Sequence, residues 1–168
     1  MNILSHSLMP IFSLPGIEHQ TIARRSDGTQ NVEAWKQSLA PGAATPPHFH
    51  ECEEVIYVMG GEGEIAIEGK TMPFQANCTL ILPPRLVHQI TNTGSEAIRL
   101  ATWLSESPAR VFLPSGERLA LPWGESARRG RVTSSGVRAS GWSVGDPATR
   151  GLRRGLLSAD APHSPSAL

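Results

Sequence analysis

The chain has 168 residues, of which 39% are hydrophobic and 18% charged, and with a formal net charge of zero it fits a single soluble globular domain. Residues 1–123 hold eight Lys/Arg against twelve Asp/Glu without a basic cluster, so we expect no nucleic-acid partner. Two cysteines are too few for a disulfide scaffold, and no stretch approaches the roughly 18 apolar residues of a transmembrane helix.

The first 29 residues mix apolar residues with Pro10, Pro15 and Gly16, and they show no sustained helical or strand period. We expect an arm that contains one short strand. The opening residues MNILSHSLMPIFSLPG lack the basic region of a signal peptide, and two prolines interrupt their apolar residues. These features predict a cytoplasmic protein that contacts no membrane.

Strand patterns dominate the chain from residue 30 to residue 107. The segment QNVEAWKQSLAPG is the first clear strand, and the segments EEVIYVMGGEGEIAIEG, TLILPP, VHQITN and AIRLATWL follow it. Regular prolines leave few windows for a long helix, and none of these windows shows a helical apolar stripe. We therefore predict an all-β barrel or sandwich, with Trp35 and Trp103 packed in its core.

Residues 124–168 are rich in Gly, Ser, Ala and Arg, and they contain seven arginines against three acids. They hold too few apolar residues to offset the entropy of ordering, so we expect a disordered tail after a domain over residues 1–123. A basic contact tail and a cloning or frameshift artefact are the alternatives.

The stretch GAATPPHFHECEEVIYVMGG, residues 42–61, gives the strongest functional signal. His48 and His50 project from the same face of a strand, and Glu54 shares their even parity where the next strand begins. Imidazole and carboxylate groups are common ligands of transition metals. Three possible ligands thus converge on one face, although an HxH pair alone is a weak signal.

This stretch resembles the first cupin motif, Gx5HxHx3Ex6G, and fills each of its specified positions. The stretch from Asn77 to Asn92 resembles the second motif, Gx5PxGx2Hx3N, with Asn77 and Arg85 in place of its two glycines. Asparagine tolerates the left-handed conformation of a glycine turn. Arg85 either carries strain there or faces the cavity mouth, where it could meet an anion.

The resemblance implies an all-β, single-domain cupin β-barrel of the jelly-roll type that binds one divalent metal ion. The implied ligands are three histidines and one carboxylate: His48, His50, Glu54 and His88. Zinc is our first expectation, and Fe, Mn, Ni and Cu also suit this set. A cupin barrel that works without metal is the alternative.

The segments VEAWKQSLAPGAATPPHFHECEEVIYVMGGEG, LPPRLVHQITNTG and LPWGES resemble the plant auxin-binding protein subfamily of cupins. In that family a zinc ion, a glutamine and a threonine hold the carboxylate of an indole-acetate ligand, and apolar residues enclose its ring. The matching positions here are Gln37, Thr45, Pro46, Ile56 and Trp123.

Three functions follow from these features. The first is a binding or sensing cupin that holds a small aromatic or apolar carboxylate at the metal. The second is a cupin metalloenzyme, a dioxygenase, isomerase or lyase, although Glu51, Glu53 and Tyr57 have odd parity and are expected to face outward. The third is an interaction module that forms a homodimer through sheet edges, which is compatible with either of the others.

Overall fold

The computed structural model describes residues 1–124, so the predicted tail lies outside the described residues except for Gly124. This part of the chain forms nine strands and two short 3-10 helices: η1 (His6–Leu8), β1 (Phe12–Leu14), β2 (Ile17–Ala23), η2 (Arg25–Asp27), β3 (Glu33–Leu39), β4 (Glu54–Gly60), β5 (Glu62–Ile67), β6 (Lys70–Gln75), β7 (Thr79–Leu82), β8 (His88–Thr91) and β9 (Ile98–Leu104). The all-β prediction is confirmed, and neither helix in residues 1–124 is long enough to cross a membrane.

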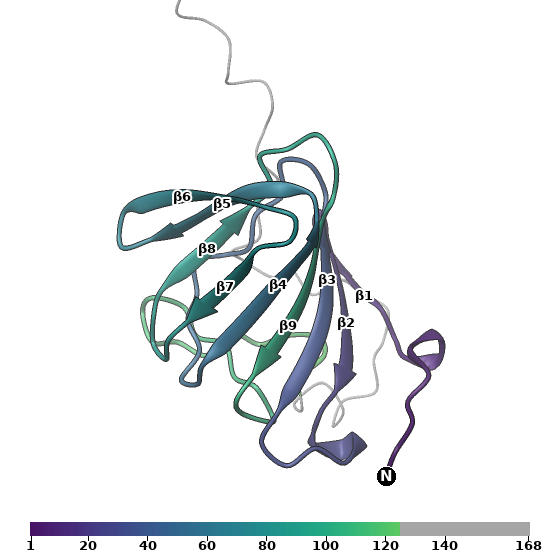
Figure 1. The fold of residues 1–168 in the computed structure, drawn as a ribbon. Coiled ribbons are helices and arrows are strands. Elements are labelled where there is room, and N and C mark those ends of the chain that lie inside the picture. The colour runs from purple at the N-terminus through teal and green to yellow at the C-terminus, as the bar shows by residue number, and fades with distance from the viewer. Residues whose placement is uncertain (125–168) are drawn as a thin grey trace, which may run out of the picture.

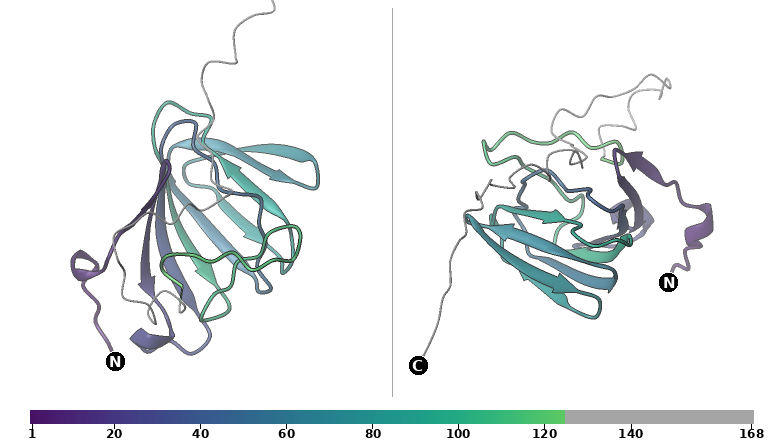
Figure 2. Two further views of the ribbon diagram at one scale, coloured as in Figure 1. Left: turned by 180° about the vertical axis from the view of Figure 1, so that it is seen from behind. Right: turned by 90° about the horizontal axis from the view of Figure 1, so that it is seen from above.

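The strands form two antiparallel sheets that face each other around a common interior (Figures 1 and 2). The larger sheet has the order β1-β2-β3-β9-β4-β7, and the smaller one has the order β6-β5-β8. Isolated bridges from Ala44 to Thr91 and from His48 to His88 lay residues 44–48 beside β8. This irregular segment therefore extends the smaller sheet and joins the two sheets into a barrel.

The first 29 residues differ from the predicted arm with one short strand. They contain both β1 and the seven-residue strand β2, which pairs with β3 from Ile17↔Leu39 to Ala23↔Ala34. The inward residues of β2 include the buried, polar His19 and Thr21. Because these residues are polar, the alternation of apolar and polar residues that identifies a half-buried strand is hidden.

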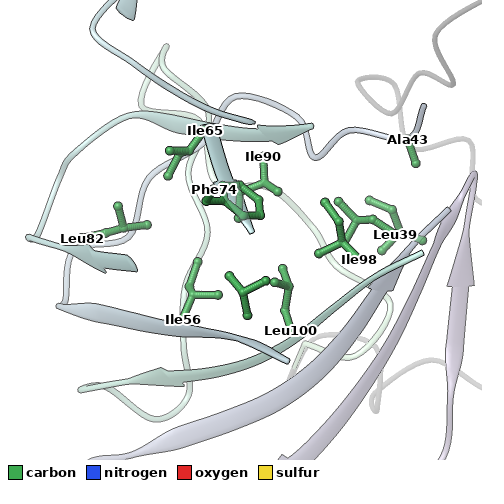
Figure 3. Close-up of a cluster of buried hydrophobic side chains, with 11 residues drawn as sticks. Leu39, Ala43, Ile56, Ile65, Phe74, Leu82, Ile90, Ile98 and Leu100 are labelled. Atoms are coloured by element: carbon green, nitrogen blue, oxygen red, sulfur yellow. The ribbon is translucent and has the colours of Figure 1, made fainter. Parts of the chain in front are cut away.

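The apolar core fills one end of the barrel between the two sheets. Side chains of Ile65, Phe74 and Ile90 from the smaller sheet point toward Ile56 and Leu100 of the larger one (Figure 3). Gly63 permits this approach, since a Cβ there would lie under 3.0 Å from both the Thr91 carbonyl oxygen and the Ile98 side chain. The core thus holds the two sheets together and extends to Ile56 and Ile90, which lie next to the histidines.

The outer face of the larger sheet carries an apolar row. Trp103 is paired with Val55, and Val55 is paired with Ile81, so that the three side chains lie in one line across β9, β4 and β7. Trp103 is 43% exposed and Ile81 is 67% exposed. The prediction that Trp103 packs in the core is therefore wrong, because Thr102 and Leu104 take the inward positions of β9.

Both residues that replace the motif glycines adopt the left-handed conformation, each with a φ of 66°. Asn77 accepts a hydrogen bond from the Tyr57 hydroxyl at 3.1 Å. The Arg85 side chain is exposed, lies 3.5 Å from Glu51 and covers the Phe49 ring. Of the two alternatives for Arg85, the structure thus shows the strained backbone, and it places the guanidinium outside the cavity.

Candidate metal centre and ligand pocket

Four candidate ligands are brought together by backbone pairing at one end of the barrel. Glu54 begins β4 and His88 begins β8, and the two backbone N–H···O bonds between His48 and His88 measure 2.9 and 3.0 Å. The carbonyl of His50 accepts a hydrogen bond from Arg85 N–H at 2.6 Å. Segments up to 40 residues apart in the sequence therefore place their side chains around one point.

Backbone carbonyls orient all three imidazole rings. The Nδ1 atoms of His48, His50 and His88 lie 2.8, 2.8 and 3.0 Å from the carbonyl oxygens of Pro46, Arg110 and Leu86, respectively. A carbonyl only accepts, so each Nδ1 carries the proton and each Nε2 presents a lone pair. This outer hydrogen bond is the usual partner of a histidine that binds metal through Nε2.

The inward atoms of the cluster are buried but have no hydrogen-bond partner within it. Glu54 Oε2 lies 3.3 Å from His88 Nε2 and 3.6 Å from His50 Nε2, and none of these three atoms makes a hydrogen bond within residues 1–124. Ligand atoms of His48, Glu54 and His88 all lie within 4.8 Å of one another, and His50 joins them through Glu54. Buried polar atoms without partners are costly, and a cation at their centre would satisfy all of them.

The pKa shifts keep His48 and His50 neutral and Glu54 ionised, which are the forms that can bind a metal ion. Burial lowers the pKa of His48 to about 3, and burial also lowers the pKa of His50. Burial alone would raise the pKa of Glu54, but the neighbouring histidines outweigh it and hold this pKa at about 2. Burial acts to lower the pKa of His88 as well, and the Glu54 carboxylate overcomes it and raises this pKa. The result is an ionised Glu54 carboxylate beside the neutral rings of His48 and His50.

A pocket of about 30 Å³ lies directly beside the four residues. Its lining includes all five residues predicted to hold a ligand: Gln37, Thr45, Pro46, Ile56 and Trp123. Trp35 also lines it and packs 6.0 Å from the His50 ring, so this buried residue belongs to the core and to the pocket wall. The volume is close to that of one water molecule, so a larger ligand requires the wall to move.

Two polar groups of the wall can contact a ligand. The Thr45 oxygen accepts a hydrogen bond from Ile90 N–H at 3.0 Å, which leaves its own hydroxyl hydrogen free to donate. The Gln37 amide nitrogen lies 3.3 Å from His19 Nδ1 and retains a second hydrogen. Glu51, Glu53 and Tyr57 are exposed, in agreement with their odd parity.

Part of the wall comes from residues that the sequence patterns do not identify. Val111, Leu119 and Leu121 follow the last strand and close the pocket together with Trp123. Bridges from Phe112 to Phe49 and to Arg118 hold this segment against the barrel. The same wall separates the pocket from an outer cavity of about 580 Å³. No strand period marks these residues, so only the resemblance of the segments SPARVFLP and LPWGES to the auxin-binding proteins pointed to this region.

Known proteins resemble the chain in sequence and in fold. The cupin domain family matches residues 35–105. Auxin-binding protein 1 of Arabidopsis thaliana is 36% identical over 112 residues, which are 61% of this chain and 57% of that protein. Auxin-binding protein 4 of Zea mays is 30% identical over 109 residues, which are 58% of this chain and 53% of that protein. The chain thus spans little more than half the length of these relatives.

A solved structure supports the same architecture. The polyketide cyclase RemF from Streptomyces resistomycificus superposes with a TM-score of 0.57 at 21% identity, covering 64% of this chain and 82% of that one. At this identity the likeness establishes the fold and leaves the chemistry to the residues themselves.

Proposed function

The chain is a cupin related to the auxin-binding proteins, and from this premise we propose that it binds a divalent metal ion and holds a small carboxylate beside it. The proposed ligands are the four residues that meet at the barrel end: His48, His50, Glu54 and His88. The ligand-holding residues are the five from the pocket wall: Gln37, Thr45, Pro46, Ile56 and Trp123.

One observation carries the metal proposal. The Nε2 atoms of His50 and His88 and the Oε2 atom of Glu54 are buried and close together, and they have no hydrogen-bond partner in the part of the chain that the structure describes. Each histidine is held by its other nitrogen, so none can turn away from the centre without losing a hydrogen bond. If these residues had no metal to bind, such buried atoms would be expected to have hydrogen-bond partners, or apolar residues would be expected in their place.

Zinc is the first candidate, because three imidazoles and one carboxylate are among its usual ligands. Fe, Mn, Ni and Cu accept the same donors. A bound metal would supply an open position that can accept a carboxylate oxygen. The Glu54 carboxylate is ionised and offers one negative charge to a bound dication.

The wall supports an apolar carboxylate as the ligand. Gln37 and Thr45 each have a hydrogen to donate, which suits carboxylate oxygens. Most of the remaining wall is aliphatic or aromatic, as an apolar body requires: Trp35, Pro46, Ile56, Ile90, Val111, Leu119, Leu121 and Trp123. The name of the auxin-binding relatives points in the same direction.

The pocket favours binding over catalysis by general acid and base. Within residues 1–124, the titratable side chains that line it are the four proposed metal ligands. An enzyme that moves protons needs a further group within reach of the substrate. The metalloenzyme alternative therefore lacks a base of its own in the described part of the chain.

The test begins with the metal. Elemental analysis of gently purified protein should find about one divalent ion per chain in the wild type and much less in His50→Ala. The variant His6→Ala removes a histidine outside the pocket and should keep the wild-type content. Equal metal content in all three proteins would overturn the ligand assignment.

Titration calorimetry on the metal-loaded protein then tests the ligand. Formate fits the pocket most easily, whereas benzoate and indole-3-acetate require the wall to move. We expect binding of at least one aromatic carboxylate, weakened in Thr45→Val, which keeps the shape but loses the hydroxyl. If none of the three compounds gives heat at millimolar concentration, the carboxylate proposal is wrong. The proposal of a metal site would not be affected by that result.

We also propose that the protein forms a homodimer through the apolar row Trp103, Val55 and Ile81. This row lies beside the edge strand β7, where the backbone can also pair. Trp103→Glu should yield monomers in analytical ultracentrifugation, whereas Met72→Glu, at an exposed apolar position of β6, should not. A wild-type monomer at micromolar concentration would contradict the dimer.

A cytoplasmic location is the last part of the proposal. Both cysteines are free thiols, as is usual in a reducing compartment. Cell fractionation of the full-length protein checks it, and recovery in the secreted fraction would overturn it.

A further inference from the structure

His19 is a fully buried histidine that lies just behind the ligand pocket. It sits on β2 directly opposite Gln37 of β3, and its ring contacts the walls of the pocket without lining the pocket itself. Among the described residues it is the buried histidine that the proposed metal site does not use. Such a polar group requires an account of its partners.

Both ring nitrogens of His19 have a partner. Nδ1 lies 3.3 Å from the amide nitrogen of Gln37, and Nε2 lies 3.0 Å from the Thr21 hydroxyl. An amide nitrogen only donates, so Nδ1 accepts and the ring proton resides on Nε2, which donates to Thr21. Burial, with a contribution from Arg24, lowers the pKa of His19 to about 3, so the ring stays neutral and keeps one acceptor and one donor.

The flat face of the same ring holds Trp123. The two rings are stacked, with centroids 3.6 Å apart and an interplanar angle of 8°. Trp35 packs on His19 at 5.1 Å, and Phe12 packs on Trp123 at 6.0 Å. Trp123 lies outside every strand, so ring contacts rather than a strand ladder set its position.

We propose that His19 is a positioning residue that acts on the ligand through Gln37 and Trp123. By accepting one amide hydrogen, it holds the Gln37 amide in place and leaves the second hydrogen to donate to the ligand. By stacking on Trp123, it fixes the ring that closes the pocket. This inference rests on the proposed binding of a carboxylate. It assigns the orientation of Gln37 and the position of Trp123 to one residue that never touches the ligand.

A purely structural role for His19 makes different predictions. A buried residue that only fills space affects the free energy of unfolding, and a ring of similar shape replaces it without changing ligand affinity. A positioning residue instead affects ligand affinity through Gln37, so its replacement lowers the affinity only while Gln37 is present. The two roles are separated by variants that keep either the shape or the acceptor.

His19→Phe keeps a flat ring for Trp123 but removes the acceptor for Gln37. His19→Asn places an oxygen near the position of Nδ1 but loses the ring. On the metal-loaded protein, we expect His19→Phe to weaken indole-3-acetate binding about 10-fold, the loss typical of one hydrogen bond. Combining His19→Phe with Gln37→Ala should weaken binding no further than Gln37→Ala alone. His19→Asn should restore part of the hydrogen-bond contribution when compared with His19→Ala.

Metal content should be the same in all these proteins, because His19 contacts none of the four proposed ligands. Wild-type affinity in a folded His19→Phe protein, together with weakened binding in Gln37→Ala, would overturn the inference. Additive losses in the double variant would overturn it as well.

A measurement without ligand keeps this inference separate from the proposed function. In nitrogen-15 spectra of the free protein, His19 should show an unprotonated Nδ1 and a protonated Nε2, and the Gln37 side-chain amide should give two well-separated hydrogen signals. His19→Phe should collapse that separation toward the value of a free amide. If no carboxylate binds the wild type, the proposed function fails, while an unchanged Gln37 signal in His19→Phe is what would refute the positioning role.

Discussion

The two ends of the barrel interior are built from the same strands but have opposite chemistry. On β4 the inward residues pass from Glu54 through Ile56 to Val58, and on β8 they pass from His88 to Ile90. At one end the side chains are apolar and pack on each other, as in Figure 3. At the other end they are polar and buried, and the inward atoms of His50, His88 and Glu54 have no hydrogen-bond partner within residues 1–124. Two residues along a strand thus separate a stabilising core from a binding site.

This contrast indicates how the barrel supports its site. The apolar end contributes most of the free energy of folding, since burial of apolar surface is the dominant favourable term. The polar end costs free energy until a ligand satisfies it. We therefore expect changes at the polar end to alter binding most and changes at the apolar end to alter stability most.

Replacement of Glu54 should have the largest effect. Glu54→Gln keeps the size of the side chain but removes its charge, so metal affinity should fall by more than the roughly 100-fold typical of a lost outer-shell partner. Competition with a chromophoric chelator measures the affinity. Glu53→Gln, one residue away and exposed, is the matched control. Unchanged affinity in Glu54→Gln would show that the polar end does not bind metal through this carboxylate.

Replacement of a core residue should lower the stability of the fold and leave metal binding unchanged. Leu100 is fully buried in the apolar cluster, so Leu100→Ala should lower the free energy of unfolding by about 2–5 kcal/mol. Metal stoichiometry in the folded protein should stay at the wild-type value. Urea denaturation and elemental analysis measure the two quantities, and loss of metal from folded Leu100→Ala would show that the two ends are not separable.

Acid should weaken the metal-free protein through His19. The folded-state pKa is about 3 against an ordinary value of 6.5, so the unfolded chain takes up a proton below pH 6.5 while the folded chain does not. Stability is therefore lost as pH falls from 6.5 toward 3, by about 2 kcal/mol between pH 7 and pH 5 from this group. Denaturation of chelator-treated protein should show a shallower pH dependence in His19→Phe than in the wild type. Identical slopes would contradict a neutral, buried His19.

The smallest effect is expected from replacing Arg85, which lies outside both ends of the barrel interior. Its φ of 66° favours glycine, so Arg85→Gly should be more stable than Arg85→Ala by about 1 kcal/mol. Its exposed side chain does not line the pocket, so both variants should keep their metal. Thermal denaturation of the pair provides the comparison, and a more stable Ala variant would indicate that the turn carries no strain.

The sequence predicted the parts of the site that depend on local periodicity. The even spacing of His48, His50 and Glu54 predicted that they share one face, because successive side chains of a strand alternate between its two faces. His88 came from the resemblance alone, and the structure places it beside Glu54. Their role as metal ligands stays a prediction. The strand pattern of residues 30–107 likewise predicted the all-β fold.

The missed features depend on contacts between distant segments. β2 was hidden because its inward residues include His19 and Thr21, which are polar yet buried against β3. Trp103 was misplaced because apolar side chains occur on both faces of β9, and composition alone does not tell which face is inward. The wall from Val111 to Leu121 has no strand period, since isolated bridges and the barrel opening determine its path.

One contact has a consequence for how such a site diversifies. The carbonyl that orients His50 belongs to Arg110, and the closing wall follows it, so both lie beyond the region matched by the cupin domain family. A chain that ended at residue 105 would retain all four proposed metal ligands, but it would lose the carbonyl that orients His50 and one side of the pocket. Replacing residues 106–124 with the corresponding segment of a relative would therefore change the pocket wall while leaving the side chains of His48, His50, Glu54 and His88 in place.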